Sequence, residues 1–238
     1  MATSPIFSQA NRLRINAELK NALNQNSDYL SDHTSTSTRA AGDAVQSLIG
    51  EKLGFILGDL AGDYPDTFAR RAMADLAFTD TDGNYHVVDV KTHRSDVSFS
   101  MPNLILVERL CRFYEVGDNY FDILLVDYSV SGNAATVSSC EVMPIEWLDW
   151  SCLIIGALGW GQIQIANAKN VRVRPQPRRE WMLTFCERIL AFYQKEIAKV
   201  SKRIVYFEKA RAFWIAQNSV ETTNVILPTL PFDEGEVG

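Results

Sequence analysis

Apolar residues recur along the chain with two different periods, and each period predicts one kind of secondary structure. Helical spacing over residues 7–25, 39–57 and 178–217 predicts three helices. We expect a fourth helix from Pro102 to about residue 116, because proline suits the first turn of a helix, where its missing N–H costs nothing.

Short apolar runs bounded by turn residues predict the strands. Residues 74–93 contain two such runs around Asp82 and Gly83, a pair typical of a β-hairpin turn. Four further runs predict strands, the first two of which form a second hairpin: residues 120–130, 135–145, 162–167 and 170–175. These elements predict an α/β fold, with a central mixed β-sheet flanked by helices.

The composition is that of one globular domain. The chain has 238 residues, of which 47% are hydrophobic, and we expect a single domain over residues 1–227. Residues 228–238 are acidic and rich in Pro and Gly, so they are expected to be a disordered tail. No apolar run approaches the ~20 residues of a membrane span, and four scattered cysteines suggest reduced thiols in the cytoplasm.

The charge is distributed unevenly. Between Lys169 and Arg211 there are twelve basic and four acidic residues, a net charge of +8 in a chain whose net charge is −6. A face this basic suits a polyanion such as DNA. The alternative is a long solvated helix that carries many lysines.

The first hairpin places charged residues on strands that are otherwise apolar. Asp89 and Lys91 are two residues apart, so both point to one face of their strand, whereas Val88 and Val90 point to the other. The turn brings Asp75 of the preceding strand close to Asp89.

Two convergent carboxylates repel each other unless a cation lies between them. Carboxylate and carbonyl oxygens suit Mg²⁺, so Asp75, Asp89 and the Val90 carbonyl are the predicted metal ligands. Asp75, Asp89 and Lys91 are the predicted catalytic residues, with Lys91 acting on the attacking water or on the phosphate. The alternative is that Asp89 and Lys91 form an ordinary surface ion pair.

The segments "ADLAF" and "VVDVK" resemble the signature of the PD-(D/E)xK nucleases, with Ala74 in the place of the usual proline. The order of "RAAGDAVQSL", "ADLAF", "VVDVKTH", "MPNLI" and "GWGQIQI" is similar to that of type II restriction endonucleases of the blunt-cutting kind. The resemblance implies a restriction-endonuclease-like core and Mg²⁺-dependent cleavage of double-stranded DNA at a short, nearly palindromic site. It also implies a homodimer and a companion DNA methyltransferase that protects the host genome.

In such enzymes, the loop after the catalytic strand and the following helix approach DNA, and amide and basic side chains contact bases and phosphates. The resulting candidates are Thr92, His93, Asn103, Gln162, Gln164, Asn167, Lys169, Arg172, Arg174 and Arg178. Asp43 is a possible supporting carboxylate. Solvent-facing roles remain open for His93, for both glutamines and for Asp43.

Two other functions remain open. A repair or junction-resolving nuclease of the same superfamily would carry the same site. A DNA-binding protein without activity would keep the basic region and would not need a metal. The sequence has no P-loop, GxSxG or HExxH motif, so it does not indicate an ATP motor, a serine hydrolase or a zinc protease.

Overall fold

The computed structural model describes residues 4–25, 30–31, 35–63, 75–97, 102–156, 160–166 and 171–217. The chain divides into two compact units, residues 1–190 and residues 191–238, and each is described by itself. Among the described residues, no helix is both long enough and apolar enough to cross a lipid bilayer. The predicted tail over residues 228–238 lies outside the described residues.

The first unit begins with helices that the sequence predicts. After the short 3-10 helix η1 (Pro5–Phe7) come α1 (Gln9–Gln25) and α3 (Thr38–Leu57). The Ser37 hydroxyl caps α3 by accepting a hydrogen bond from the Ala40 N–H at 3.3 Å. The apolar stripe of α3 is buried, as its helical spacing predicts, and includes Ala41, Val45, Ile49, Leu53 and Ile56.

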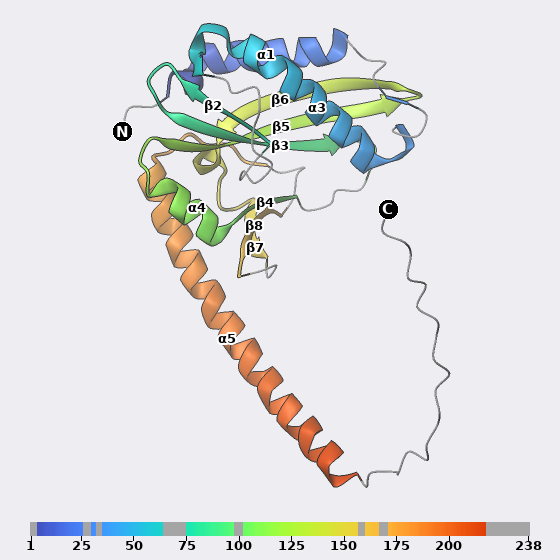
Figure 1. Cartoon of the computed structure of the whole chain (residues 1–238), viewed down its shortest axis with the longest axis vertical. Coiled ribbons are helices and arrows are strands. Elements are labelled where there is room, and N and C mark those ends of the chain that lie inside the picture. The colour runs from blue at the N-terminus through green and yellow to red at the C-terminus, as the bar shows by residue number, and fades with distance from the viewer. Residues whose placement is uncertain are drawn as a thin grey trace, which may run out of the picture. The chain divides into compact units, whose positions relative to one another are not determined.

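A mixed five-stranded sheet forms the centre of this unit (Figure 1). Its strands in spatial order are β1 (Ala61–Asp63), β2 (Leu76–Asp80), β3 (Tyr85–Arg94), β5 (Asn119–Ser131) and β6 (Ala134–Pro144). Strands β3 and β5 are parallel, and the other neighbours are antiparallel. Both predicted hairpins are confirmed, and their turns contain Gly83 (φ 84°) and Gly132 (φ 58°), values that glycine adopts without strain.

A smaller sheet corrects the helix predicted from Pro102. Residues Asn103–Leu106 form β4, which pairs with β8 (Gln162–Ile165), and helix α4 begins only at Val107 and ends at Tyr114. Leu104 and Ile105 are buried in this pairing. Long-range strand pairing therefore outweighs the local preference of proline for a helix start.

The remaining elements are a strand, two 3-10 helices and a long last helix. The third strand of the smaller sheet, β7 (Leu153–Gly156), was not predicted. The prediction of a strand over residues 170–175 is wrong. In its described part, residues 171–175, an isolated bridge joins Val173 to Leu148, and no strand forms. The 3-10 helices η2 (Gly58–Leu60) and η3 (Ile145–Trp147) flank strands of the main sheet, and the predicted last helix is confirmed as α5 (Arg178–Ala216).

Both faces of the main sheet are covered by other elements, and an apolar core lies on each side. One face packs against α1 and α3, and the other packs against α4, the smaller sheet and the first turns of α5. Strand β3 contributes to both sides: Val88 and Val90 face the α3 side, whereas Val87 faces the α4 side. The alternation predicted for this strand is therefore confirmed.

A buried charged cluster joins three strands of the sheet. The His86 ring lies 2.7 Å (Nδ1) from Asp122 Oδ2 and 3.2 Å (Nε2) from Asp80 Oδ2. The ring also stacks between Phe78 and Tyr120, at centroid distances of 4.6 Å and 4.9 Å. Burial disfavours the imidazolium, yet the two carboxylates raise the pKa of His86 above its usual value.

Gly42 sets how closely α3 approaches β3. A Cβ atom built at this position would lie 2.6 Å from Thr92 Oγ1. We expect Gly42→Ala to lower the free energy of unfolding by about 1–3 kcal/mol, measured by urea denaturation. The double variant Gly42→Ala/Thr92→Ala should recover most of the loss, because the obstructing hydroxyl is gone.

Gly50 of the same helix is the matched control. The nearest atom to a Cβ there is Leu76 Cδ2 at 3.4 Å, an ordinary contact. Gly50→Ala should be neutral, or stabilising by up to about 1 kcal/mol through helix propensity. Equal losses at both glycines would contradict the role of close packing at Gly42.

Candidate active site

Asp75 closes the open end of the β2–β3 hairpin. Its backbone N–H donates to the Val88 carbonyl at 3.0 Å, and its Oδ2 accepts a hydrogen bond from the Val90 N–H at 2.7 Å. The predicted approach of Asp75 to the Asp89 segment is therefore present in the structure. The carboxylate is fixed by the backbone of the strand that carries the other two candidates.

Asp89 and Lys91 form an ion pair with a Lys91 Nζ to Asp89 Oδ1 distance of 2.8 Å. The Asp89 side chain is 8% exposed, and its Oδ2 is buried without a hydrogen-bond partner among the described residues. Burial raises the pKa of Asp89 to about 7, although the Lys91 charge opposes the shift and the Asp75 charge adds to it. Asp89 thus carries a buried oxygen that no described protein group satisfies.

A divalent cation fits this pair of carboxylates. It would add positive charge next to the two carboxylates, beyond that of Lys91, and would bind Asp89 Oδ2, which has no hydrogen-bond donor among the described residues. Among the described residues, no group of three or more His, Cys, Asp or Glu side chains is arranged to hold a metal. A cation here would therefore bind two carboxylates together with carbonyl and water oxygens, the kind of ligand set that Mg²⁺ accepts. The Val90 carbonyl remains the predicted third protein ligand.

Helix α3 brings further polar groups to Asp75. Asp43, Asp75 and Leu76 line an open depression of about 330 Å³. The other lining residues are Gln46, Ser47 and Gly50. The prediction did not include Gln46 and Ser47, yet their spacing of three and four residues from Asp43 places them on the same helical face. The structure therefore supports a position for Asp43 beside the candidate site.

Thr92 and His93 lie on opposite faces of β3. Thr92 faces Gly42 of α3, away from Asp89 and Lys91. His93 shares the face of Lys91, and its Nδ1 lies 2.9 Å from Asp127 Oδ1. The structure thus brings His93, but not Thr92, to the side of the sheet that carries the lysine.

The amide candidates lie together in the smaller sheet. Gln164 Nε2 donates to Asn103 Oδ1 across the pair β4 and β8. Strand β8 lies between β4 and β7, so these glutamines are on the central strand of the smaller sheet. Gln164 is buried, and a Cβ at Gly156 would overlap its amide, whereas Gln162 is half-buried. Gln162 and Asn103 are therefore the more accessible of the three amides.

The basic candidates separate into two environments. Arg172 and Arg174 are exposed on the segment before α5. Arg178 is half-buried: its Nε donates to Glu146 Oε1 at 2.8 Å, and its guanidinium lies 4.3 Å from the ring centroids of both Tyr114 and Tyr120.

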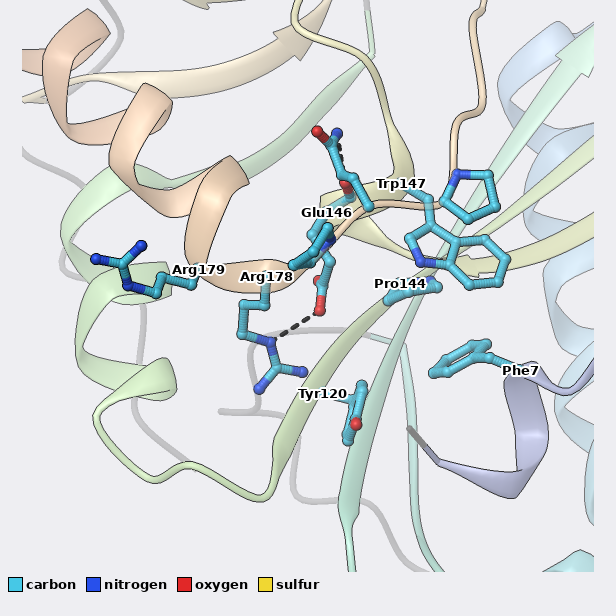
Figure 2. Close-up of a pocket in the computed structure, with 10 residues that line it drawn as sticks. Phe7, Tyr120, Pro144, Glu146, Trp147, Arg178 and Arg179 are labelled. Atoms are coloured by element: carbon cyan, nitrogen blue, oxygen red, sulfur yellow. Dashed lines mark hydrogen bonds and ion pairs between the residues drawn. The ribbon is translucent and has the colours of Figure 1, made fainter. Parts of the chain in front are cut away.

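This ion pair lies in a recess of about 670 Å³, which Phe7 and Trp147 also line. Figure 2 shows these side chains around the recess. Because its guanidinium is already engaged by these protein groups, we leave Arg178 out of the proposed DNA surface. Asn167 and Lys169 lie outside the described residues.

No protein-family description matches the chain, and no curated protein matches it. The functional argument therefore rests on the residues themselves.

The pKa of Asp89 predicts a pH-dependent effect on stability. Because the folded pKa is raised, the penalty for ionising Asp89 grows as the pH rises from about 4 through about 7. Asp89→Asn removes that penalty. Without metal, its gain in free energy of unfolding should be on the order of 3 kcal/mol larger at pH 8 than at pH 5.

The effect of Mg²⁺ on the melting temperature tests whether Asp89 binds a cation. At pH 8, Mg²⁺ should raise the melting temperature of the unmodified protein and leave that of Asp89→Asn unchanged. Asp82→Asn, in the exposed turn of the same hairpin, is the control and should respond as the unmodified protein does. An equal response of Asp89→Asn to Mg²⁺ would show that the cation binds elsewhere.

The two environments of the arginines predict different outcomes of truncation. Arg178→Ala leaves Glu146 buried without its counter-charge and should cost about 3–5 kcal/mol of stability. Arg174→Ala, whose side chain is 70% exposed, should change stability by less than about 0.5 kcal/mol. Thermal unfolding of the two variants measures the difference, and similar losses would contradict it.

Proposed function

We propose that this protein is a Mg²⁺-dependent endonuclease that hydrolyses phosphodiester bonds in double-stranded DNA, of the type II restriction class that cuts at short, nearly palindromic sites. One observation carries the proposal. Asp75 and Asp89 converge from neighbouring strands, and Asp89 holds a buried oxygen that has no donor among the described residues. Lys91 stands beside that carboxylate.

Each residue has a distinct role in the proposal. Asp75 and Asp89 hold the cation, and the hydrogen bond from the Val90 N–H fixes the orientation of Asp75. Bound Mg²⁺ would make a coordinated water more acidic and would offset negative charge on the phosphate. Lys91 either takes part in deprotonating the attacking water or stabilises the phosphate by its charge. Its ammonium is already positioned by Asp89, 2.8 Å away.

Side chains elsewhere in the chain are compatible with a nucleic-acid substrate. Arg172 and Arg174 are exposed in a segment whose net charge is strongly positive, and such side chains neutralise phosphates without reading sequence. Gln162 and Asn103 provide amides that could contact base edges. In this proposal, a companion methyltransferase that modifies the same sites protects the host DNA.

Two alternatives share these residues. A repair or junction-resolving nuclease would use the same three residues on a different DNA shape. A non-catalytic DNA-binding protein is favoured by one observation: Lys91 pairs with Asp89 at 2.8 Å, so the two residues can serve as a structural ion pair. Such a protein would bind DNA without Mg²⁺ and would leave it intact.

Cleavage of unmethylated phage DNA tests the proposal. The purified chain should produce discrete fragments with Mg²⁺ and none with EDTA. Asp75→Asn, Asp89→Asn and Lys91→Ala should each reduce cleavage at least about 100-fold, because each removes a group that acts on the reacting phosphate or its metal.

The matched control is again Asp82→Asn, which keeps the hairpin and should cut normally. Fragments of undefined length, or cutting restricted to branched DNA, would favour the other nucleases. DNA that is retarded on a gel but never cut would favour the binding protein. Normal cutting by Asp89→Asn would exclude this site.

A further inference from the structure

Helix α5 carries a row of exposed apolar side chains in the second unit. Ile197, Val200, Ile204, Phe207 and Trp214 are each between 52% and 71% exposed. Side chains of this size are scattered singly on most protein surfaces, whereas here they recur along one helix. Their spacing is the feature that needs an explanation.

The spacing alternates between three and four residues, which is the heptad pattern of a coiled coil. Ile197, Ile204 and Arg211 fall at positions a of the heptad. The d positions are Tyr193, Val200, Phe207 and Trp214. We call the apolar members of these two sets the α5 seam. A repeat of 3.5 residues keeps the seam facing one neighbouring helix, whereas an apolar face that packs on a globular core follows a period of 3.6.

The opposite side of the helix is basic. Lys195, Lys202 and Lys209 are seven residues apart and occupy the f positions, which lie farthest from the seam. A helix with an apolar a/d row and charged f positions is suited to a single partner on the seam side and to water or a polyanion on the other. Tyr206 and Phe213 occupy c positions, which are separated from the seam by the g positions. One partner helix would therefore not cover them.

The charges beside the seam indicate what the partner is. Arg203 occupies a g position and Glu208 the following e position, and these two positions face each other across a parallel pair of identical helices. Their opposite charges therefore complement each other when the partner is the same sequence in the same register. Arg211 is the one charged residue at an a position, a substitution that lowers stability but restricts register and chain number.

We propose that the α5 seam is the surface through which two copies of this chain associate, as a parallel, in-register coiled coil. The assignment rests on the heptad, the exposure and the flanking charges, so it is independent of the proposed cleavage activity. It identifies a surface for the dimer that the sequence resemblance only implies. In the pair, the lysines at the f positions point outward from both helices and stay accessible.

The molar mass of the full-length chain in solution tests the association. Light scattering should give twice the 26.7 kDa of one chain at micromolar concentration. Ile197→Glu/Ile204→Glu should give a single-chain mass, because it places charges inside the seam. Lys195→Glu/Lys202→Glu on the opposite face is the matched control and should remain a dimer. A single-chain mass for the unmodified protein, or a dimer that survives the seam variant, would overturn the proposal.

A disulfide tests the same surface without disturbing the helix. In a Cys186→Ser background, which removes the exposed native thiol, Val200→Cys should give a covalent dimer on mild oxidation. Lys202→Cys, two residues away on the outer face, should stay monomeric on a denaturing gel. A dimer by light scattering that fails to cross-link at Val200→Cys would overturn the parallel register.

Discussion

The imidazole of His86 holds together the part of the fold on which the candidate site depends. Each of its ring nitrogens contacts a carboxylate of a neighbouring strand: Asp80 on β2 and Asp122 on β5. Its ring also stacks on an aromatic residue of each strand. Polar and stacking contacts thus favour one register for three strands, because any slip would leave buried charges unpaired. Asp89 lies three residues further along β3, so its depth in the sheet is set by the same register.

The buried carboxylates of this sheet fall into two kinds. Asp80 receives hydrogen bonds from Ser4, Asn84 and the backbone, and these lower its pKa despite burial. Asp122 is fully buried with a raised pKa; the His86 ring binds its Oδ2, and its Oδ1 has no hydrogen-bond partner among the described residues. Asp89 has only one donor, and that donor is a half-exposed lysine. Asp89 differs from Asp122 in its donor: Lys91 is partly exposed, whereas His86 is fully buried, so Asp89 is the candidate functional carboxylate.

The sequence predicted the β2–β3 hairpin well because its signals are local. The turn at Asp82 and Gly83, the alternation along β3 and the helical face of α3 all depend on residues a few positions apart. The segment after Pro102 was predicted wrongly because its partner, β8, lies about 60 residues further along the chain, and the pairing of two short strands leaves no local trace. The ion pair of Arg178 with Glu146 could not be predicted for a similar reason, since it follows from tertiary packing and not from the basic composition around it.

The alternation of side chains along β3 also limits how this protein can change during evolution. An insertion or deletion of one residue that shifted β3 would turn Asp89 and Lys91 toward α3 and would present Val90 to the other side. The His86 contacts oppose such a shift, so a change in length must be absorbed within the turn of residues 81–84. Changes in length can therefore be accommodated at the tip of the hairpin, whereas the number of residues from His86 to Lys91 must stay constant.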